Sequence, residues 1–266
     1  MTTFRDRTLR FALGSSVPRL AYRHLFISNG SIDSMLHVQN PFSFFDPHGH
    51  HRALVAIETF DADGTLIGSF DQELAPFASL AKPVVEVVGN RCASGFGSVT
   101  IDILPPPKFR DYLRRSTDKI PRIASPFWVR FWDDSGSQAF VHSIEADLTK
   151  FRGVAWPLSR VLIRKPTQVR WESDRTISVG EDMSVEAFVV NHSRTTLTTD
   201  CQWVSLDRGI ESESRIQIEP RGTSLVSLPE EITGNIFLRL SRLSTPNAKP
   251  YVIVRNHEGL FGLTHG

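Results

Sequence analysis

The amino-acid sequence predicts an all-β protein made of two tandem immunoglobulin-like antiparallel β-sandwich domains that arose by internal duplication. Short segments rich in β-branched and aromatic residues alternate with turn signals every 8 to 12 residues or so, which is typical of β-sandwiches. Helical periodicity is nearly absent from the 266 residues, and several motifs recur in the same order in both halves. We therefore predict domains at 15–146 and 155–266, with a short helical insertion at 104–122 in the first.

The strands of the first copy are predicted from their composition and from the turns that separate them. Asp-Ala-Asp-Gly at 61–64 stands between two apolar runs, as expected of a hairpin turn. The segments that we predict to be strands are ALVAIETF (53–60), LIGSF (66–70), PVVEVV (83–88), VTIDIL (99–104) and FWVRFW (127–132).

The duplication is predicted from residues that match in order between the two halves of the chain. The segment at 98–105 also resembles 234–241, and a linker is expected around 146–157. The first copy is longer than the second before Gly136, and we place the extra residues at 104–122. The matched pairs are Gly64 with Gly209, Gly89 with Gly234, Asn90 with Asn235, Gly136 with Gly259, and His142 with His265.

The composition is that of a soluble globular protein, with 40% hydrophobic and 22% charged residues. A formal net charge of +1 gives no global field that would attract nucleic acid or a membrane. No apolar run approaches the roughly 18 residues of a membrane span, and the N-terminal apolar run is too short for a secretory signal. We therefore expect a cytoplasmic protein that does not contact a membrane.

The predicted insertion at 104–122 carries the strongest basic patch of the sequence. Three prolines precede a possible helix start, and Phe109, Tyr112 and Leu113 fall on one helical face. Such a patch could bind a partner, although one short segment offers few phosphate contacts and makes nucleic acid an unlikely ligand. The candidate binding residues in this patch are Arg110, Arg114 and Arg115.

Three histidines, His48, His50 and His51, follow Asp46 within a few positions. If the backbone were extended there, His48 and His50 would share a face and could hold a transition metal with a third ligand. The cluster lies in a loop that is longer than its counterpart in the second copy, and loops are polar by default. We expect a solvated loop without a cofactor and keep a metal site as the alternative.

The strand FWVRFW is the most informative candidate for binding. Alternation directs Trp128, Arg130 and Trp132 to the face opposite the core side chains of the same strand. Two indoles and a guanidinium could form a platform for sugar rings or for another protein. Alternatively, the inserted segment could fold over this face, with Arg130 stacked between the two tryptophans.

The second copy provides further candidates for an interface. The matching segment at 250–256 is apolar on both faces, so Ile253 should be covered by a subunit or domain contact. His142 and His265 end the two repeats and could line one interface, although a strand-end histidine commonly makes an ordinary hydrogen bond.

No catalytic motif is recognisable in the sequence. There is no Gly-x-Ser-x-Gly segment, and the calcium-loop-like stretch at 61–72 lacks the required glycine and final glutamate. The leading hypothesis is a non-catalytic cytoplasmic module that binds a protein or associates with itself. The alternatives are a metal-dependent enzyme that uses the histidine cluster and a carbohydrate-binding module that uses Trp128 and Trp132.

Overall fold

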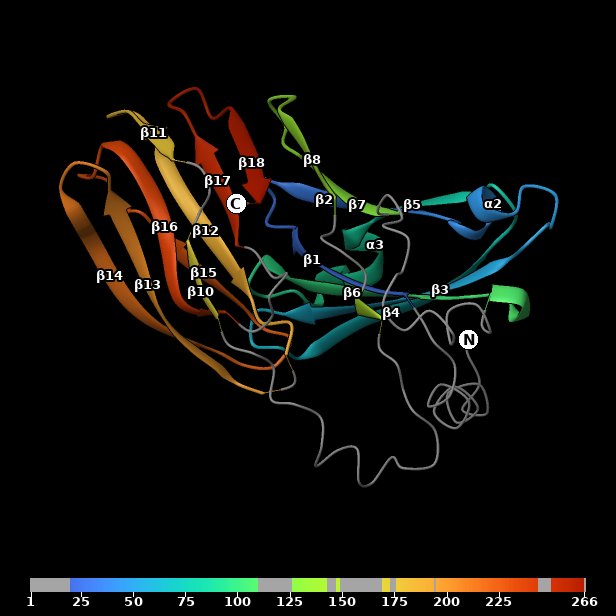
Figure 1. Ribbon diagram of the computed structural model, residues 1–266. Coiled ribbons are helices and arrows are strands. Elements are labelled where there is room, and N and C mark those ends of the chain that lie inside the picture. The colour runs from blue at the N-terminus through green and yellow to red at the C-terminus, as the bar shows by residue number, and fades with distance from the viewer. Residues whose placement is uncertain are drawn as a thin grey trace.

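The protein folds into two antiparallel β-sandwiches that lie side by side, which confirms the predicted fold class (Figure 1). The computed structural model describes residues 20–109, 126–142, 147–148, 169–172, 176–193, 195–243 and 250–265. Within those ranges the strands form four sheets, two from each half of the chain. None of the helices in those ranges is long and apolar enough to cross a membrane.

The first sandwich pairs one five-stranded sheet with one four-stranded sheet. In spatial order the five-stranded sheet contains β4 (Leu66–Leu74), β3 (Ala53–Asp61), β6 (Phe96–Leu104), β1 (Leu20–Ile27) and β9 (Asp147–Leu148). The four-stranded sheet contains β5 (Ser79–Pro83), β2 (Asp33–Gln39), β7 (Phe127–Trp132) and β8 (Gln138–His142). The short helical elements of the first sandwich are α2 (Phe42–Phe45), α3 (Val84–Val88) and the 3-10 turn η1 (Gly89–Arg91).

The second sandwich repeats the strand order of the first, except that β9 has no counterpart among its described strands. One sheet contains β14 (Gly209–Ile218), β13 (Leu197–Ser205), β16 (Gly234–Leu243) and β10 (Val169–Glu172), with β11 (Ile177–Val179) also paired to β16. The other sheet contains β15 (Thr223–Ser227), β12 (Ser184–Val190), β17 (Tyr251–Arg255) and β18 (Phe261–His265).

The hairpin that ends each repeat has the same register in both copies. Trp128 stands opposite His142 on β7 and β8, and Tyr251 stands opposite His265 on β17 and β18. The glycines of the two turns both have positive φ, 88° at Gly136 and 80° at Gly259. The predicted equivalence of these segments is therefore confirmed residue by residue, and it makes Arg130 and Ile253 counterparts.

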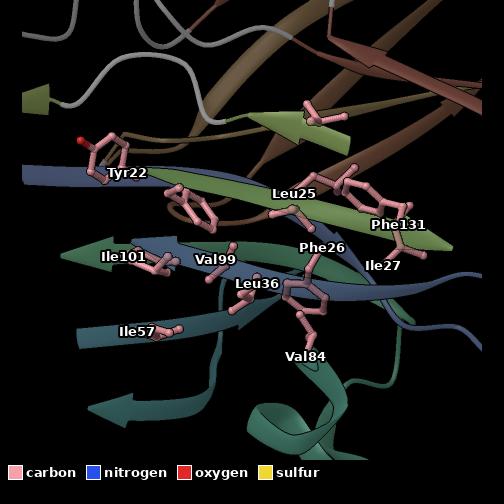
Figure 2. Packing of buried hydrophobic residues seen from close by; sticks show 14 of the residues in the cluster. Tyr22, Leu25, Phe26, Ile27, Leu36, Ile57, Val84, Val99, Ile101 and Phe131 are labelled. Atoms are coloured by element: carbon pink, nitrogen blue, oxygen red, sulfur yellow. The ribbon is translucent and has the colours of Figure 1, made fainter. Parts of the chain in front are cut away.

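Two details of the predicted repeat are wrong. The segment at 83–88 is mostly the helix α3 rather than a strand, and Gly89 follows this helix whereas Gly234 begins β16. Alternating apolar residues favour a strand, but Val84, Val87 and Val88 lie on one helical face and are buried there. Figure 2 shows Val84 directed from α3 toward Phe26, so tertiary packing selects the helix.

The predicted insertion and linker are only partly described. Residues 107–109 are helical, which agrees with a helix start after the prolines, and the rest of the basic segment to residue 122 lies outside the described residues. Within the expected linker, β9 (Asp147–Leu148) pairs with β1 and so belongs to the first sandwich.

The core of the first sandwich continues into the second sandwich. Tyr251, Ile253 and Phe188 are buried in the same hydrophobic cluster as the first sandwich's own core, while a separate cluster fills the second sandwich. The ring of Tyr251 lies 4.6 Å from that of His24, and the ring of Phe188 lies 5.2 Å from that of Phe96. The outer face of the sheet that contains β12 and β17 is thus covered by the chain itself.

Two tight turns interlock at this contact. The β3–β4 turn of the first sandwich touches the β14–β15 turn of the second, where the N–H of Thr223 donates to the carbonyl oxygen of Ala62 at 2.9 Å. A Cβ atom at Gly64 would lie 2.2 Å from the carbonyl oxygen of Pro220, and one at Gly222 would lie 2.6 Å from that of Ala62. Both positions therefore need glycine for the backbones to approach.

A buried histidine at the same contact predicts a pH effect on stability. Arg23 Nη1 donates to the carbonyl oxygen of His192 at 2.6 Å, and burial lowers the pKa of His192 well below 6.5, as do the nearby charges of Arg23, Arg221 and His24. The imidazole of His192 binds a proton more readily in the unfolded chain than in the folded protein. The free energy of unfolding is therefore highest above pH 6.5 and decreases as the pH falls toward the pKa of His192 in the folded protein.

We expect the free energy of unfolding to decline below pH 6.5 by up to about 1.4 kcal/mol per pH unit from this group. Denaturation with urea between pH 7 and pH 5.5 measures the slope. The substitution His192→Asn should give a shallower slope, and identical slopes in both proteins would exclude His192 as the cause.

Candidate functional site

The strand β7 alternates as predicted. Phe127, Val129 and Phe131 are fully buried in the core of the first sandwich, whereas Trp128, Arg130 and Trp132 are half-buried on the opposite side of the sheet. We call this side the aromatic face and define it as Trp128, Arg130 and Trp132 of β7 with His37 of β2 and Phe140 of β8.

The neighbouring strands complete the aromatic face. His37 stands opposite Trp128, and the two rings stack 5.5 Å apart with only 7° between their planes. Arg130 stands opposite Phe140, and its guanidinium carbon lies 5.4 Å from the ring centre of Trp132 and 6.0 Å from that of Phe140. Arg130 therefore stacks on Trp132 and Phe140, while the part of the inserted segment beyond residue 109, which the alternative places over this face, lies outside the described residues.

Two nitrogen atoms of the aromatic face lie beneath its surface. His37 Nε2 and Arg130 Nε are shielded from solvent and make no hydrogen bond within the described residues. Burial lowers the pKa of His37, and the charge of Arg130 lowers it further. The face thus combines flat apolar rings, a cation and a neutral imidazole, which suits a ligand with an apolar ring face and polar edges.

The equivalent face of the second sandwich has a different environment. Tyr251, Ile253 and Arg255 stand on β17 where Trp128, Arg130 and Trp132 stand on β7. Tyr251 and Ile253 are buried against the first sandwich, whereas Phe140 on the aromatic face is 60% exposed. The duplicated face is therefore closed by the chain in the second copy, and Ile253, a predicted partner contact, offers no surface to a second molecule.

The histidine cluster forms a folded loop rather than an extended segment. Residues 47–49 make turns, and His50 has a positive φ of 46°, so His48 and His50 do not share a strand face. Both side chains are exposed. The condition for the metal site, an extended backbone, is thus not met at these residues.

The third histidine of the cluster is engaged inside the loop. His51 Nε2 lies 2.9 Å from Asp46 Oδ2, and Lys108 forms a salt bridge with the same carboxylate. Hydrogen bonding from Lys108, and then from His51, lowers the pKa of Asp46 to about 2. No group of three metal-ligating side chains occurs in the described part of the chain.

The remaining predicted binding residues are two histidines at strand ends and three arginines of the insertion. His142 ends β8 and is exposed, and His265 ends β18. These two strands lie side by side, so the two histidines stand on neighbouring elements, as a shared interface would require. Arg110, Arg114 and Arg115 fall outside the described residues.

His37 and Phe140 are the site residues that sequence reasoning missed. Both belong to strands that alternate, DSMLHVQ for β2 and QAFVH for β8, so their outward direction could have been read from the sequence. Their position beside β7 could not, because it depends on which strands pair.

The fold and the aromatic face together define a two-sandwich β protein with a partly exposed aromatic sheet face. No protein-family model matches the chain, and no curated protein matches it. A β-glucuronidase from glycoside hydrolase family 2 is similar in structure over 94% of this chain and 24% of its own, with a TM-score of 0.21 and 10% identity.

Two further solved structures have comparable similarity. A Bacteroides uniformis β-glucuronidase matches with a TM-score of 0.20 and 12% identity, over 94% of this chain and 26% of its own. The Amycolatopsis orientalis exo-chitosanase CsxA matches with a TM-score of 0.18 and 10% identity, over 92% and 26%. The chain spans about a quarter of the length of these proteins, and similarity of this extent gives no information about its activity.

Proposed function

We propose that the chain is a non-catalytic carbohydrate-binding module that holds a sugar chain along β7. The observation that carries this proposal is the row of Trp128, Arg130 and Trp132 on an open sheet face. Alternate residues of a strand repeat every 6.6 Å or so, which puts the backbone positions of Trp128 and Trp132 about 13 Å apart with that of Arg130 midway. An extended chain of rings can contact all three groups, because the C–H face of a sugar ring packs against an aromatic face.

The structure around the other two candidate sites, the apolar face of β17 and the histidine cluster, favours the aromatic face as the binding site. Self-association was expected mainly because the apolar face of β17 needed a cover, and the first sandwich provides that cover within the chain. The metal-dependent alternative relied on the histidine cluster, where His51 is engaged with Asp46. Among the described residues, the aromatic face keeps the exposed ring of Phe140 beside three half-buried side chains of β7.

A protein partner, or a second copy of the chain, is the second candidate for the same face. The exposure of Phe140 favours it, as does the presence of tryptophan and arginine, the residues most enriched in interface hot spots. A protein partner would contact the same residues as a sugar chain, so the experiment distinguishes the two candidates by which kind of ligand binds.

The experiment combines affinity electrophoresis on a panel of neutral and acidic polysaccharides with light scattering at micromolar concentration. We expect the wild type to be retarded by at least one polysaccharide, and the substitution Trp128→Ala together with Trp132→Ala to weaken binding at least about tenfold. Phe44→Ala is the matched control, because Phe44 is 66% exposed but lies on α2 outside the sheet.

Retardation that is unchanged in the double variant would contradict a sugar site on the aromatic face. A wild type that binds none of the polysaccharides but forms a dimer sensitive to Trp132→Ala would support the second candidate instead.

A further inference from the structure

We infer that the sugar chain carried on the aromatic face is acidic, with a uronic-acid carboxylate bound by Arg130. This inference rests on the proposed function and adds the class of sugar. It is drawn from the charge of the Arg130 guanidinium, from the rings that hold this group in place and from the position of Arg130 between Trp128 and Trp132 on β7.

The charge of Arg130 is not neutralised within the described part of the protein. Its direct neighbours across the sheet are Met35 on β2 and Phe140 on β8, neither of which carries a charge. Asp33, an acidic residue on the same side of β2, stands opposite Trp132 and accepts a hydrogen bond from Ser28 Oγ at 3.0 Å. A half-buried cation without a counter-ion favours an anionic ligand, because the ligand would supply the missing charge.

The guanidinium is also held in position before any ligand binds. Contact with the rings of Trp132 and Phe140 fixes its plane, which reduces the conformational entropy lost on binding. A carboxylate matches this planar group because its two oxygens can accept from the two terminal Nη atoms at the same time.

His37 supports the ring of Trp128 beside the carboxylate position. Its imidazole stacks on the indole of Trp128 at 5.5 Å, and this contact holds the indole in place. Burial lowers the pKa of His37, and the charge of Arg130 lowers it further, so His37 adds no second positive charge next to the guanidinium.

The position of Arg130 indicates a polymer rather than a single acidic sugar. Arg130 stands between Trp128 and Trp132 on one side of β7, about 6.6 Å along the strand from each, and its guanidinium carbon lies 5.4 Å from the ring centre of Trp132. A carboxylate at Arg130 therefore belongs to a residue whose neighbours in the sugar chain can contact Trp128 and Trp132. The structure favours a polyuronate over a neutral glycan for this reason.

The test compares two forms of one polymer, polygalacturonate and its fully methyl-esterified form, by affinity electrophoresis and by titration of tryptophan fluorescence. The two forms share their sugar rings and differ in the carboxylate charge. We expect the protein to bind polygalacturonate roughly 10 to 100 times more tightly than the methyl ester. Dextran sulfate, at matched ionic strength, serves as a polyanion without carboxylates and should bind more weakly than polygalacturonate.

Two substitutions separate charge from geometry. Arg130→Gln should abolish the preference for the free acid, and Arg130→Lys should reduce it about tenfold, because lysine keeps the charge but loses the planar fork. Arg208→Gln is the control, because Arg208 is an exposed arginine in the β13–β14 turn of the second sandwich. Thermal unfolding of each variant confirms that it is folded before binding is compared.

Equal binding of polygalacturonate and its methyl ester, lost in the Trp128→Ala variant, would overturn the acidic ligand and leave the carbohydrate-binding function intact. Equal or tighter binding of dextran sulfate would show general polyanion attraction and would also overturn the inference. If neither these polymers nor neutral glycans bind, the proposed function fails together with it.

Discussion

Replacing Ile253 with glutamate is expected to lower the free energy of unfolding by more than about 4 kcal/mol. The Ile253 side chain is fully buried in the hydrophobic cluster that the two sandwiches share. A carboxylate there would lose its hydration without gaining a charged partner, so the second sandwich could no longer pack on the first. Urea denaturation followed by tryptophan fluorescence and circular dichroism measures the loss.

The matched control is Arg130→Glu at the equivalent position of the first copy. Because Arg130 lies on the open aromatic face, this change should alter stability by only about 1 kcal/mol. Equal losses in the two variants would mean that the outer face of β7 is as firmly covered as that of β17. A stable, folded Ile253→Glu protein that instead changes its oligomeric state would show that Ile253 faces another subunit.

Gly64→Ala should destabilise the protein by about 2 to 4 kcal/mol. Gly64 has a φ of 85°, a conformation that costs an alanine about 1 kcal/mol. The added Cβ would also lie 2.2 Å from the carbonyl oxygen of Pro220, so the two interlocked turns would have to separate. Separation would break the hydrogen bond from Thr223 to Ala62 and expose part of the shared core.

Gly209→Ala separates these two effects. Gly209 occupies the corresponding hairpin turn of the second copy with a φ of 84°, but a Cβ there would meet nothing within 4 Å. This variant should therefore lose only about 1 kcal/mol, the conformational part alone. Chemical denaturation of both variants gives the difference, and equal losses would show that the contact between the turns contributes nothing to stability.

Duplication has given the two copies of one sheet face different environments. The residues that stand at Trp128 and Arg130 in the first copy are Tyr251 and Ile253 in the second. The second copy's face packs on the first sandwich and is fully apolar where it is most buried. The first copy's face keeps a cation and exposed rings, as expected of a surface that meets water and a polar ligand.

Much of the fold could be predicted because local chemistry determines it. Composition and turn signals identified β3, β4, β6 and β7, and the hairpin turn predicted at 61–64 contains Gly64 with a positive φ. The matched glycines Gly136, Gly209 and Gly259 also have positive φ. The sides of β7 were also predictable, since a strand with a buried face can present its other residues in only one direction. Of the aromatic face, the sequence thus identified Trp128, Arg130 and Trp132.

The tertiary structure decided what depends on partners far away in the chain. The valines of α3 form a helix because the first sandwich buries Val84 and Val88 at that position, against their local preference for strand. His37 and Phe140 join the aromatic face because β2 and β8 pair with β7. Asp46 binds both His51 and Lys108 because the loop folds back.

The sequence by itself determined that this protein is a duplicated β protein with one aromatic strand face, because strand periodicity and turn glycines are properties of neighbouring residues. It could also predict that the apolar face around Ile253 must be covered, since exposed apolar surface is costly in water. Only the tertiary structure decided that the first sandwich covers Ile253, because the cover is formed by residues more than a hundred positions away in the chain, such as His24 against Tyr251. The aromatic face stays open among the described residues for the same reason, because the second sandwich packs on the first sandwich elsewhere.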